Sequence, residues 1–121
     1  PTSPLLKTAT LDKAINYFCE NDIDTIISAK TSAHLEWKKY KNIYIPLYEE
    51  RLNRQYLEKK FVETGGFLIT KPEYILRNSR IGKKLDLFVL NKGEDIDIDN
   101  YEDWAACEYL INKKNEQIDR L

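Results

Sequence analysis

The sequence predicts an α/β fold, because segments with helical and strand patterns alternate along the chain. The first helical pattern follows Thr10, a suitable N-cap residue, and ends near Asn21. Its apolar residues recur at the spacing of one helix face: Leu11, Ala14, Ile15 and Phe18. The β-branched residues within 25–29 then predict a short buried strand. A helix followed closely by an apolar strand is typical of this fold class.

The second half of the chain repeats strand and helix signals. Residues 65–70 predict an apolar strand that begins with two glycines, and Pro72 favours a short helix directly after it. Residues 85–90 predict a further strand. Asn100 and Asp103 then form the pattern of a capping box at the start of a helix. With 121 residues, the chain has the length of one domain.

Composition limits the partners and the compartment. Nineteen Lys and Arg residues oppose twenty Asp and Glu residues, and the formal net charge of -1 removes the simplest argument for a nucleic-acid partner. No apolar run is long enough to cross a membrane, so we expect no membrane partner. The sequence shows no leader pattern and its two cysteines do not form a secreted disulfide framework. We therefore expect a cytoplasmic protein with reduced thiols.

Residues 39–60 are the least regular part of the sequence. Basic residues alternate there with tyrosines, which could indicate a nucleic-acid surface, but acidic residues accompany them throughout. Amphipathic aromatic residues among charges are also typical of subunit contacts. Because a long polar segment in a small domain is usually functional, we expect an extended arm that contacts a partner subunit.

Three aspartates at alternate positions follow the strand predicted over 85–90: Asp95, Asp97 and Asp99. In an extended chain they share one face, while Ile96 and Ile98 share the other. Neighbouring Cα atoms on one face lie only about 6 to 7 Å apart, so ionised carboxylates there repel one another unless a cation, water or backbone donors compensate. Two fixed carboxylates beside phosphate oxygens are what Mg²⁺ uses in proteins. The pattern therefore indicates a candidate metal site.

Two other interpretations of this acidic segment need weighing. The spacing matches the start of an EF-hand loop, but that loop requires Gly where Asn100 stands and Glu where Ala106 stands. We therefore exclude an EF-hand. The second interpretation, an acidic strand end that only caps the following helix, stays open on spacing alone.

The acidic segment belongs to a series of motifs that resembles a known family. Asp97 and Asp99, with the acidic helix start at 101–104 and Glu108, resemble the carboxy-terminal signature of acylneuraminate cytidylyltransferases, the CMP-N-acetylneuraminic acid (CMP-sialic acid) synthetases. The remaining segments that agree, in the same order, are Pro1–Leu6, Asn53–Gln55, Phe61, Glu63, Gly65–Phe67 and Ile81–Lys84. The resemblance spans the chain from Pro1 to about Leu110.

This resemblance implies a Rossmann-like nucleotidyltransferase fold with three α/β/α layers. The reaction it implies joins CTP to the anomeric hydroxyl of a nonulosonic acid, releasing pyrophosphate, with Mg²⁺ as cofactor. Family members are usually homodimers in which an extended arm helps to close the partner's site. On this basis residues 1–121 would form a single, truncated cytidylyltransferase domain with 39–60 as the dimerisation arm.

Five residues take roles from the resemblance, each at its matching position. Asp97 and Asp99 match the metal-binding pair that would hold Mg²⁺ against the α-phosphate, and one of them could accept the proton of the attacking hydroxyl. Arg54 matches an arginine near the sugar, where its planar guanidinium suits a carboxylate. Gln55 would donate or accept a hydrogen bond from the sugar, and Gly65 would let the backbone approach it.

The sequence also departs from the family pattern. An Arg-Gly-Gly-Ser-Lys type loop that cradles the nucleotide phosphates is absent, and so is the Gln expected before Pro1. We therefore expect the amino-terminal part of the fold to be missing and this chain alone not to form a CMP-sugar. Two alternatives remain: a sister cytidylyltransferase for Kdo, pseudaminic or legionaminic acid, and a non-catalytic oligomerisation module on the same scaffold.

Overall fold

The computed structural model describes residues 2–120 and divides them into two compact units. The sheet unit contains the residues up to Lys30 together with those from Glu63 onward. The hairpin unit is Thr31–Val62. Each unit is described by itself below.

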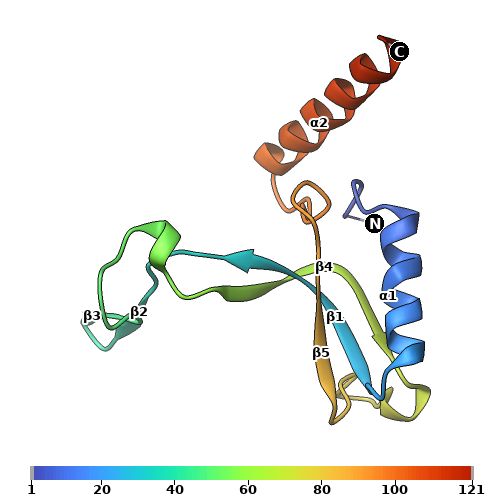
Figure 1. The fold of residues 1–121 in the computed structure, drawn as a ribbon. Helices are drawn as coiled ribbons and strands as arrows, with labels where there is room; N and C mark the ends of the chain where they lie inside the picture. Colours follow the sequence, from blue (N-terminus) through green and yellow to red (C-terminus); the bar gives the residue numbers. More distant parts are fainter. Residues whose placement is uncertain (1, 121) are drawn as a thin grey trace. The chain divides into compact units, whose positions relative to one another are not determined.

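The sheet unit contains a three-stranded sheet with the strand order β4-β1-β5 (Figure 1). Its elements are α1 (Thr8–Glu20), β1 (Thr25–Ser32), β4 (Lys60–Thr70), a 3₁₀ helix (Pro72–Tyr74), β5 (Leu85–Val89) and α2 (Tyr101–Asp119). The end of β1 (residues 31–32) and the start of β4 (residues 60–62) belong to the hairpin unit. The predicted α/β class is confirmed, because this unit combines a mixed sheet with helices.

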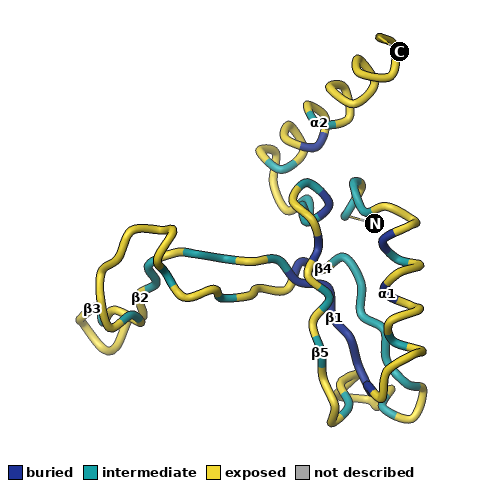
Figure 2. The backbone as a smooth tube through the Cα atoms, viewed as in Figure 1, coloured by how far each residue is buried: buried dark blue, intermediate teal, exposed yellow. Residues whose placement is uncertain are grey.

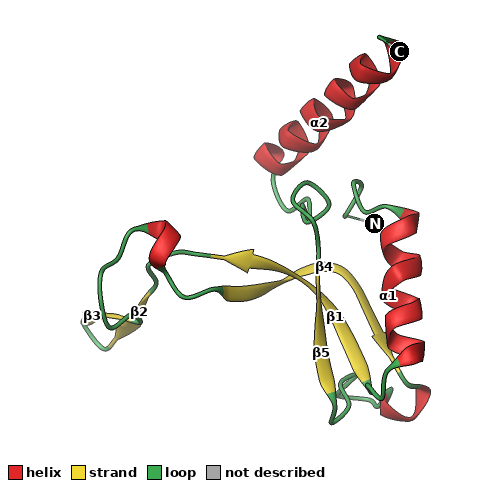
Figure 3. Ribbon diagram, in the orientation of Figure 1, coloured by secondary structure: helices red, strands yellow, loops and turns green. Residues whose placement is uncertain are grey.

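The two edge strands run in different directions relative to β1. β5 pairs with β1 in parallel, from Thr25 opposite Leu85 to Ala29 opposite Val89. β4 runs antiparallel to β1, because Lys71 N–H donates to the Asp24 carbonyl while the earlier residues of β4 meet the later residues of β1 (Figure 3). The central strand is buried over its first five residues, as the run of buried backbone in Figure 2 shows.

The two faces of the sheet differ in their cover. Tyr17 of α1 donates its hydroxyl to Asp86 at 2.7 Å, so α1 lies over the face on which Asp86 stands. Side chains alternate along a strand, and the opposite face of β5 therefore carries Leu85, Leu87 and Val89. These three side chains stay 40% exposed or more. In the described residues, this face of β5 is an open apolar surface.

A buried carboxylate connects the three strands at the end of the sheet where β1 and β5 begin. Asp24 accepts hydrogen bonds from the Lys71 ammonium at 2.9 Å and from the backbone N–H groups of Lys83 and Lys84 at 3.1 and 3.0 Å. The bond from Lys71, followed by that from the Lys84 backbone, holds the pKa of Asp24 far below its usual range. Gly82 is required in this turn, because a Cβ there would collide with Asp24 and Tyr74. One side chain thus links the start of β1 to both of its neighbours.

A second buried carboxylate attaches α1 to the segment after β5. Glu94 accepts the Thr10 hydroxyl at 2.6 Å and the Lys7 N–H at 3.0 Å. Burial raises the pKa of Glu94, but these hydrogen bonds outweigh it, so the pKa lies below its usual value. Thr10 as N-cap is therefore a wrong prediction: α1 begins at Thr8 with Lys7 at its N-cap, and the Thr10 hydroxyl is engaged by Glu94 instead.

The start of α2 confirms the predicted capping box. The Asn100 side chain accepts from the Asp103 N–H at 2.9 Å, and the Asp103 carboxylate accepts from the Asn100 N–H at 3.2 Å. Among residues 2–120, no helix combines the length and the apolar character that a bilayer crossing requires.

The hairpin unit contains two short antiparallel strands, β2 (Trp37–Tyr40) and β3 (Ile43–Pro46). The turn between them places Lys41 at φ 54°, in the left-handed region that tight hairpin turns require. A 3₁₀ helix, Arg54–Tyr56, follows. Apolar side chains of both strands are largely exposed, among them Trp37, Tyr40, Ile43 and Tyr44. The arm predicted over 39–60 lies within this unit, and its role in dimerisation stays a prediction.

The contact of Thr10 with Glu94 predicts a measurable stability effect. Thr10→Val keeps the side-chain volume but removes a hydrogen bond to a buried charge, and we expect the free energy of unfolding to fall by about 1.5–3 kcal/mol. Thr8→Val, on the exposed first turn of α1, is the matched control and should have little effect. Denaturant unfolding at neutral pH measures both variants.

The contact of Thr10 with Glu94 also predicts how the stability difference between wild type and Thr10→Val changes with pH. The pKa of Glu94 is lowered in the fold, so its hydrogen bonds stabilise the protein above the ordinary carboxyl pKa, and that contribution is lost as the pH falls through the lowered value. The gap between wild type and Thr10→Val should therefore narrow in acid. A gap that widens in acid would contradict this role of Glu94.

Candidate metal site at the carboxyl end of the sheet

The acidic segment lies where the parallel strands end. Residues 91–100 follow β5 directly, and β1 and β5 are parallel, so the segment begins at the carboxyl edge of this pair. In α/β sheets, ligands bind beyond the carboxyl ends of the strands. The segment is not a regular extended strand: a turn covers 92–94, and the residues up to Ile98 are irregular. Ile96, Asp97 and Ile98 are all half-buried, so the simple alternation predicted for the segment is absent.

Two residues selected from the sequence meet in this site. Gly65 in β4 has a φ of +71°, and a Cβ built on it would lie 2.5 Å from the Asp97 Oδ2 atom. The Asp97 carboxylate therefore lies directly over the Gly65 backbone, at a place that a larger residue would fill. The expected close approach at Gly65 exists, and the group that the structure brings there is Asp97 itself.

The Asp97 carboxylate is incompletely satisfied. Its Oδ1 atom is buried, and within residues 2–120 it has no hydrogen-bond partner. A buried carboxylate oxygen without a donor is unfavourable and is therefore an informative exception in a folded protein. A cation would compensate it, and a hard divalent ion prefers oxygen ligands of this kind. The donor set thus fits Mg²⁺.

Asp99 and Asp95 have different surroundings. Asp99 is exposed, and its backbone N–H donates to the Asp103 carboxylate at 3.1 Å. Asp95 accepts the Gly93 N–H at 3.0 Å within the turn. The helix cap is formed by Asn100 and Asp103, so the interpretation of the acidic segment as a solvated cap accounts for the exposed Asp99 but not for the buried Oδ1 atom of Asp97.

A protein-only metal cage is not formed here. In the part of the chain that the structure describes, no three His, Cys, Asp or Glu side chains gather as metal ligands. One or two carboxylates are nevertheless sufficient for Mg²⁺ when substrate phosphates and water complete its shell. A Mg²⁺ ion at this site would therefore need water or a phosphate-bearing ligand to complete its shell.

Arg54 and Gln55, the candidate sugar-binding residues, belong to the hairpin unit. Both lie in the 3₁₀ helix Arg54–Tyr56 and are exposed. The same unit contains a cavity of about 530 Å³, to which His34, Tyr48 and Tyr56 contribute. Among residues 2–120, no partner forms a hydrogen bond with the side chain of Arg54 or Gln55, and their assignment to the sugar stays a prediction.

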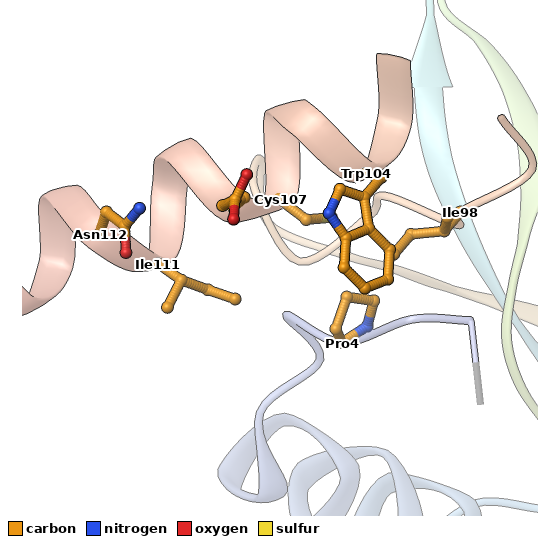
Figure 4. A pocket seen from close by; sticks show the side chains of 7 residues that line it. Pro4, Ile98, Trp104, Cys107, Ile111 and Asn112 are labelled. Carbon is orange, nitrogen blue, oxygen red and sulfur yellow. The ribbon is translucent and has the colours of Figure 1, made fainter. Parts of the chain in front are cut away.

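An apolar pocket of about 300 Å³ lies between α2 and the first residues of the chain. Figure 4 shows the Trp104 ring beside Pro4 and Ile98. Cys107, which also lines the pocket, is buried, and burial raises the pKa of its thiol. A thiol with a raised pKa suits packing rather than nucleophilic chemistry, as the sequence predicts. Cys19, by contrast, is exposed, so the expected core position is wrong for that residue.

Sequence reasoning missed two polar residues beside the site, Ser28 and Thr64. Ser28 is fully buried in β1 and Thr64 is buried in β4, and their hydroxyl oxygens lie 2.8 Å apart. The available signal is a serine among the apolar residues Ile26, Ile27 and Ala29, and a threonine directly before two glycines.

Comparisons with known proteins give one curated relative and no matching family model. The relative is the post-translational flagellin modification protein B of Campylobacter coli, which is 27% identical over 129 residues. The match covers 96% of this chain and 52% of the relative, so the chain spans about half the length of that protein. The chain is thus a distant homologue of a protein involved in flagellin modification.

The contact of Gly65 with Asp97 predicts the effect of one added methyl group. In Gly65→Ala the Cβ would meet the Asp97 carboxylate and the φ of +71° would be strained, which costs of order 1–3 kcal/mol. We expect the free energy of unfolding to fall by that amount. Gly93→Ala is the control for backbone strain alone, because φ is +98° there but nothing lies within 4 Å of the added Cβ. Its loss of stability should therefore be smaller than that of Gly65→Ala.

Thermal and denaturant unfolding compare the two variants. In a Gly65→Ala, Asp97→Ala double variant the steric conflict with the carboxylate is absent, so part of the loss should be recovered. If the double variant recovers nothing, the carboxylate does not occupy the space above Gly65.

Proposed function

We propose that this chain is part of a Mg²⁺-dependent cytidylyltransferase, a nucleotidyltransferase that activates an acidic sugar with CTP. The observation that carries the proposal is the buried, unpartnered Oδ1 atom of Asp97, held over Gly65 at the carboxyl end of the sheet. This arrangement places one fixed carboxylate where α/β proteins bind phosphate-bearing ligands. The motif order from the amino-terminal segment to α2 supports the same class.

In the proposed reaction, the anomeric hydroxyl oxygen of the sugar forms a bond to the α-phosphorus of CTP. The bond from that phosphorus to the bridging oxygen breaks, and pyrophosphate leaves with its electron pair. The hydroxyl proton passes to a carboxylate, for which Asp97 and Asp99 are the candidates. Both carboxylates would hold Mg²⁺, which supplies positive charge against the phosphate oxygens when bound.

The sugar is assigned by class only. Arg54 offers a planar guanidinium that suits the carboxylate of a nonulosonic acid, and Gln55 offers an amide for its hydroxyl groups. A sialic acid is our first choice, with Kdo, pseudaminic and legionaminic acid as alternatives. The name of the relative supports a sugar donor indirectly, because a nucleotide-activated sugar is a suitable donor for modifying a protein after translation. We place the reaction in the cytoplasm, where CTP is available.

The alternative is a non-catalytic module that keeps the scaffold. Such a module would have no use for an unsatisfied buried carboxylate, whereas Asp24 and Glu94 show that this chain can satisfy its buried acids fully. Binding of Mg²⁺ therefore discriminates the two.

Titration with Mg²⁺ tests the proposal on the chain itself. We expect calorimetry to detect Mg²⁺ binding that weakens at least about tenfold in Asp97→Asn, with a smaller loss in Asp99→Asn. Asp95→Asn is the matched control, because an asparagine Oδ1 can still accept the Gly93 N–H. Without the cation, Asp97→Asn should be no less stable than wild type, since it removes the charge from a half-buried carboxylate whose Oδ1 atom is buried without a partner.

The outcome that would reject the metal site is equally direct. Equal Mg²⁺ affinity in wild type and Asp97→Asn would exclude Asp97 as a ligand. Absence of binding in wild type would favour the non-catalytic module.

We propose self-association through the hairpin unit as the second part of this function. Trp37, Ile43 and Tyr44 are each more than half exposed on β2 and β3, an unusual apolar surface for an isolated protein. Aromatic residues on such surfaces are typical of interface cores. A homodimer is the simplest closed assembly.

Sedimentation velocity checks the assembly. We expect a dimer whose population falls at a given concentration in Ile43→Lys, because the charge would be buried in the contact. Lys38→Ala, on the neighbouring strand, is the control. A wild-type protein that remains monomeric at all concentrations contradicts the proposal.

A further inference from the structure

β4 departs from regular strand hydrogen bonding beside the candidate metal site. The Phe67 N–H donates to the Ser28 hydroxyl oxygen at 2.9 Å, where a regular ladder would use a backbone carbonyl. The Gly66 N–H points to the Thr64 hydroxyl at 3.4 Å. The Thr64 hydroxyl in turn donates to Ser28 at 2.8 Å. Two buried side chains thus supply the hydrogen bonds that the strand backbone lacks at this point.

The position of these hydroxyls relative to Gly65 is the important feature. Gly65 stands between Thr64 and Gly66, so its left-handed backbone is enclosed by the two hydrogen-bonded residues. Local distortions of this kind, with a glycine in the left-handed region, are frequent beside active sites, where they redirect part of a strand. Gly66 has little free space either, since a Cβ on it would lie 3.1 Å from the Ser28 hydroxyl.

The conformation of the Gly65 backbone affects the position of the Asp97 carboxylate. The Asp97 carboxylate lies on the Gly65 backbone, so any shift of Gly65 changes the surface on which the carboxylate lies. Ser28 is anchored in the fully buried part of β1 and therefore cannot follow such a shift. The hydroxyl pair connects the rigid centre of the sheet to the backbone beneath the candidate metal ligand.

We propose that Ser28 and Thr64 are positioning residues: their buried hydroxyl pair fixes the Gly65 backbone and thereby the place of the Asp97 carboxylate. The inference deepens the proposed function and rests on it only for the identity of the ligand. Neither hydroxyl contacts that ligand in this proposal, and each acts through Gly65.

β4 offers a matched control for the hydroxyl pair. Thr70 and Thr25 form a second hydroxyl contact between the same two strands, at 2.7 Å, and Thr70 also donates to the Asp24 carbonyl at 3.1 Å. Thr25 is the first residue of β1, three positions before Ser28, and Thr70 is the last residue of β4, five positions beyond Gly65. Thr64→Val and Thr70→Val therefore delete the same group from the same strand, one beside Asp97 and one remote from it.

The first experiment observes Asp97 without any cation. In protein labelled with carbon-13, the carboxyl resonance of Asp97 is assigned by its loss in Asp97→Asn. We expect that resonance to move beyond its linewidth in Ser28→Ala and in Thr64→Val, and to stay in place in Thr70→Val and in Thr64→Ser, which keeps the hydroxyl. A purely structural role would lower stability in Thr64→Val and Thr70→Val alike without this difference.

The second experiment titrates the same variants with Mg²⁺ alone. We expect Ser28→Ala and Thr64→Val to weaken binding by about tenfold or somewhat less, because they act on the ligand indirectly. Thr64→Ser should restore the wild-type affinity. If wild type binds no Mg²⁺, the metal site of the proposed function fails, while the carbon-13 result still decides the positioning role.

The inference is overturned if the Asp97 resonance is unchanged in Thr64→Val, or if Thr70→Val moves it equally. Should Ser28→Ala fail to fold, Thr64→Val and its serine counterpart decide the matter on their own.

Discussion

The candidate site depends on one constraint, the fixed position of the strands at the end of the sheet where β1 and β5 begin. Asp24 holds Lys71 after β4 and the two backbone N–H groups before β5, so one carboxylate fixes where β4 ends and where β5 begins. The register of the strands then determines what meets at the opposite edge. Gly65 and the segment after β5 come together there because their strands are aligned at the other end.

Three buried or half-buried carboxylates of the sheet unit differ in how fully they are hydrogen-bonded. Asp24 and Glu94 each receive several hydrogen bonds, and their lowered pKa values reflect this. Asp97 keeps a buried oxygen without a partner within the described residues. A chain that satisfies its other buried acids so fully retains an unsatisfied one where a ligand can supply the missing charge.

The sequence was sufficient to predict elements whose signals are local. The α2 start follows from Asn100 and Asp103, and the strands at 25–29 and 85–90 follow from their apolar residues, because capping and burial patterns act over a few positions. Thr10 shows the limit. Its hydroxyl is taken by Glu94, 84 residues away, and no local pattern contains that contact.

The candidate site was predictable to a similar extent. Asp97 and Gly65 were selected through the family resemblance, and in the structure the Asp97 carboxylate lies over the Gly65 backbone. Ser28 and Thr64 could not be found in this way, because their role depends on the antiparallel pairing of β4 with β1, which sequence spacing does not determine. Arg54 and Gln55 lie in another unit of the fold, so their relation to Asp97 remains a hypothesis.

The small number of carboxylates defines what this site can bind. Mg²⁺ dehydrates reluctantly and keeps several water or phosphate oxygens, so the half-buried Asp97 carboxylate with the exposed Asp99 beside it in sequence offers too few ligands to hold the ion firmly alone. In the proposed function the remaining ligands would come from water and from the substrate phosphates, and cation and phosphate would then bind cooperatively at Asp97. The proposed function therefore predicts Mg²⁺ binding to the chain alone that is detectable by calorimetry but weaker than binding in the presence of nucleotide, whose phosphates would carry the charge that the cation neutralises.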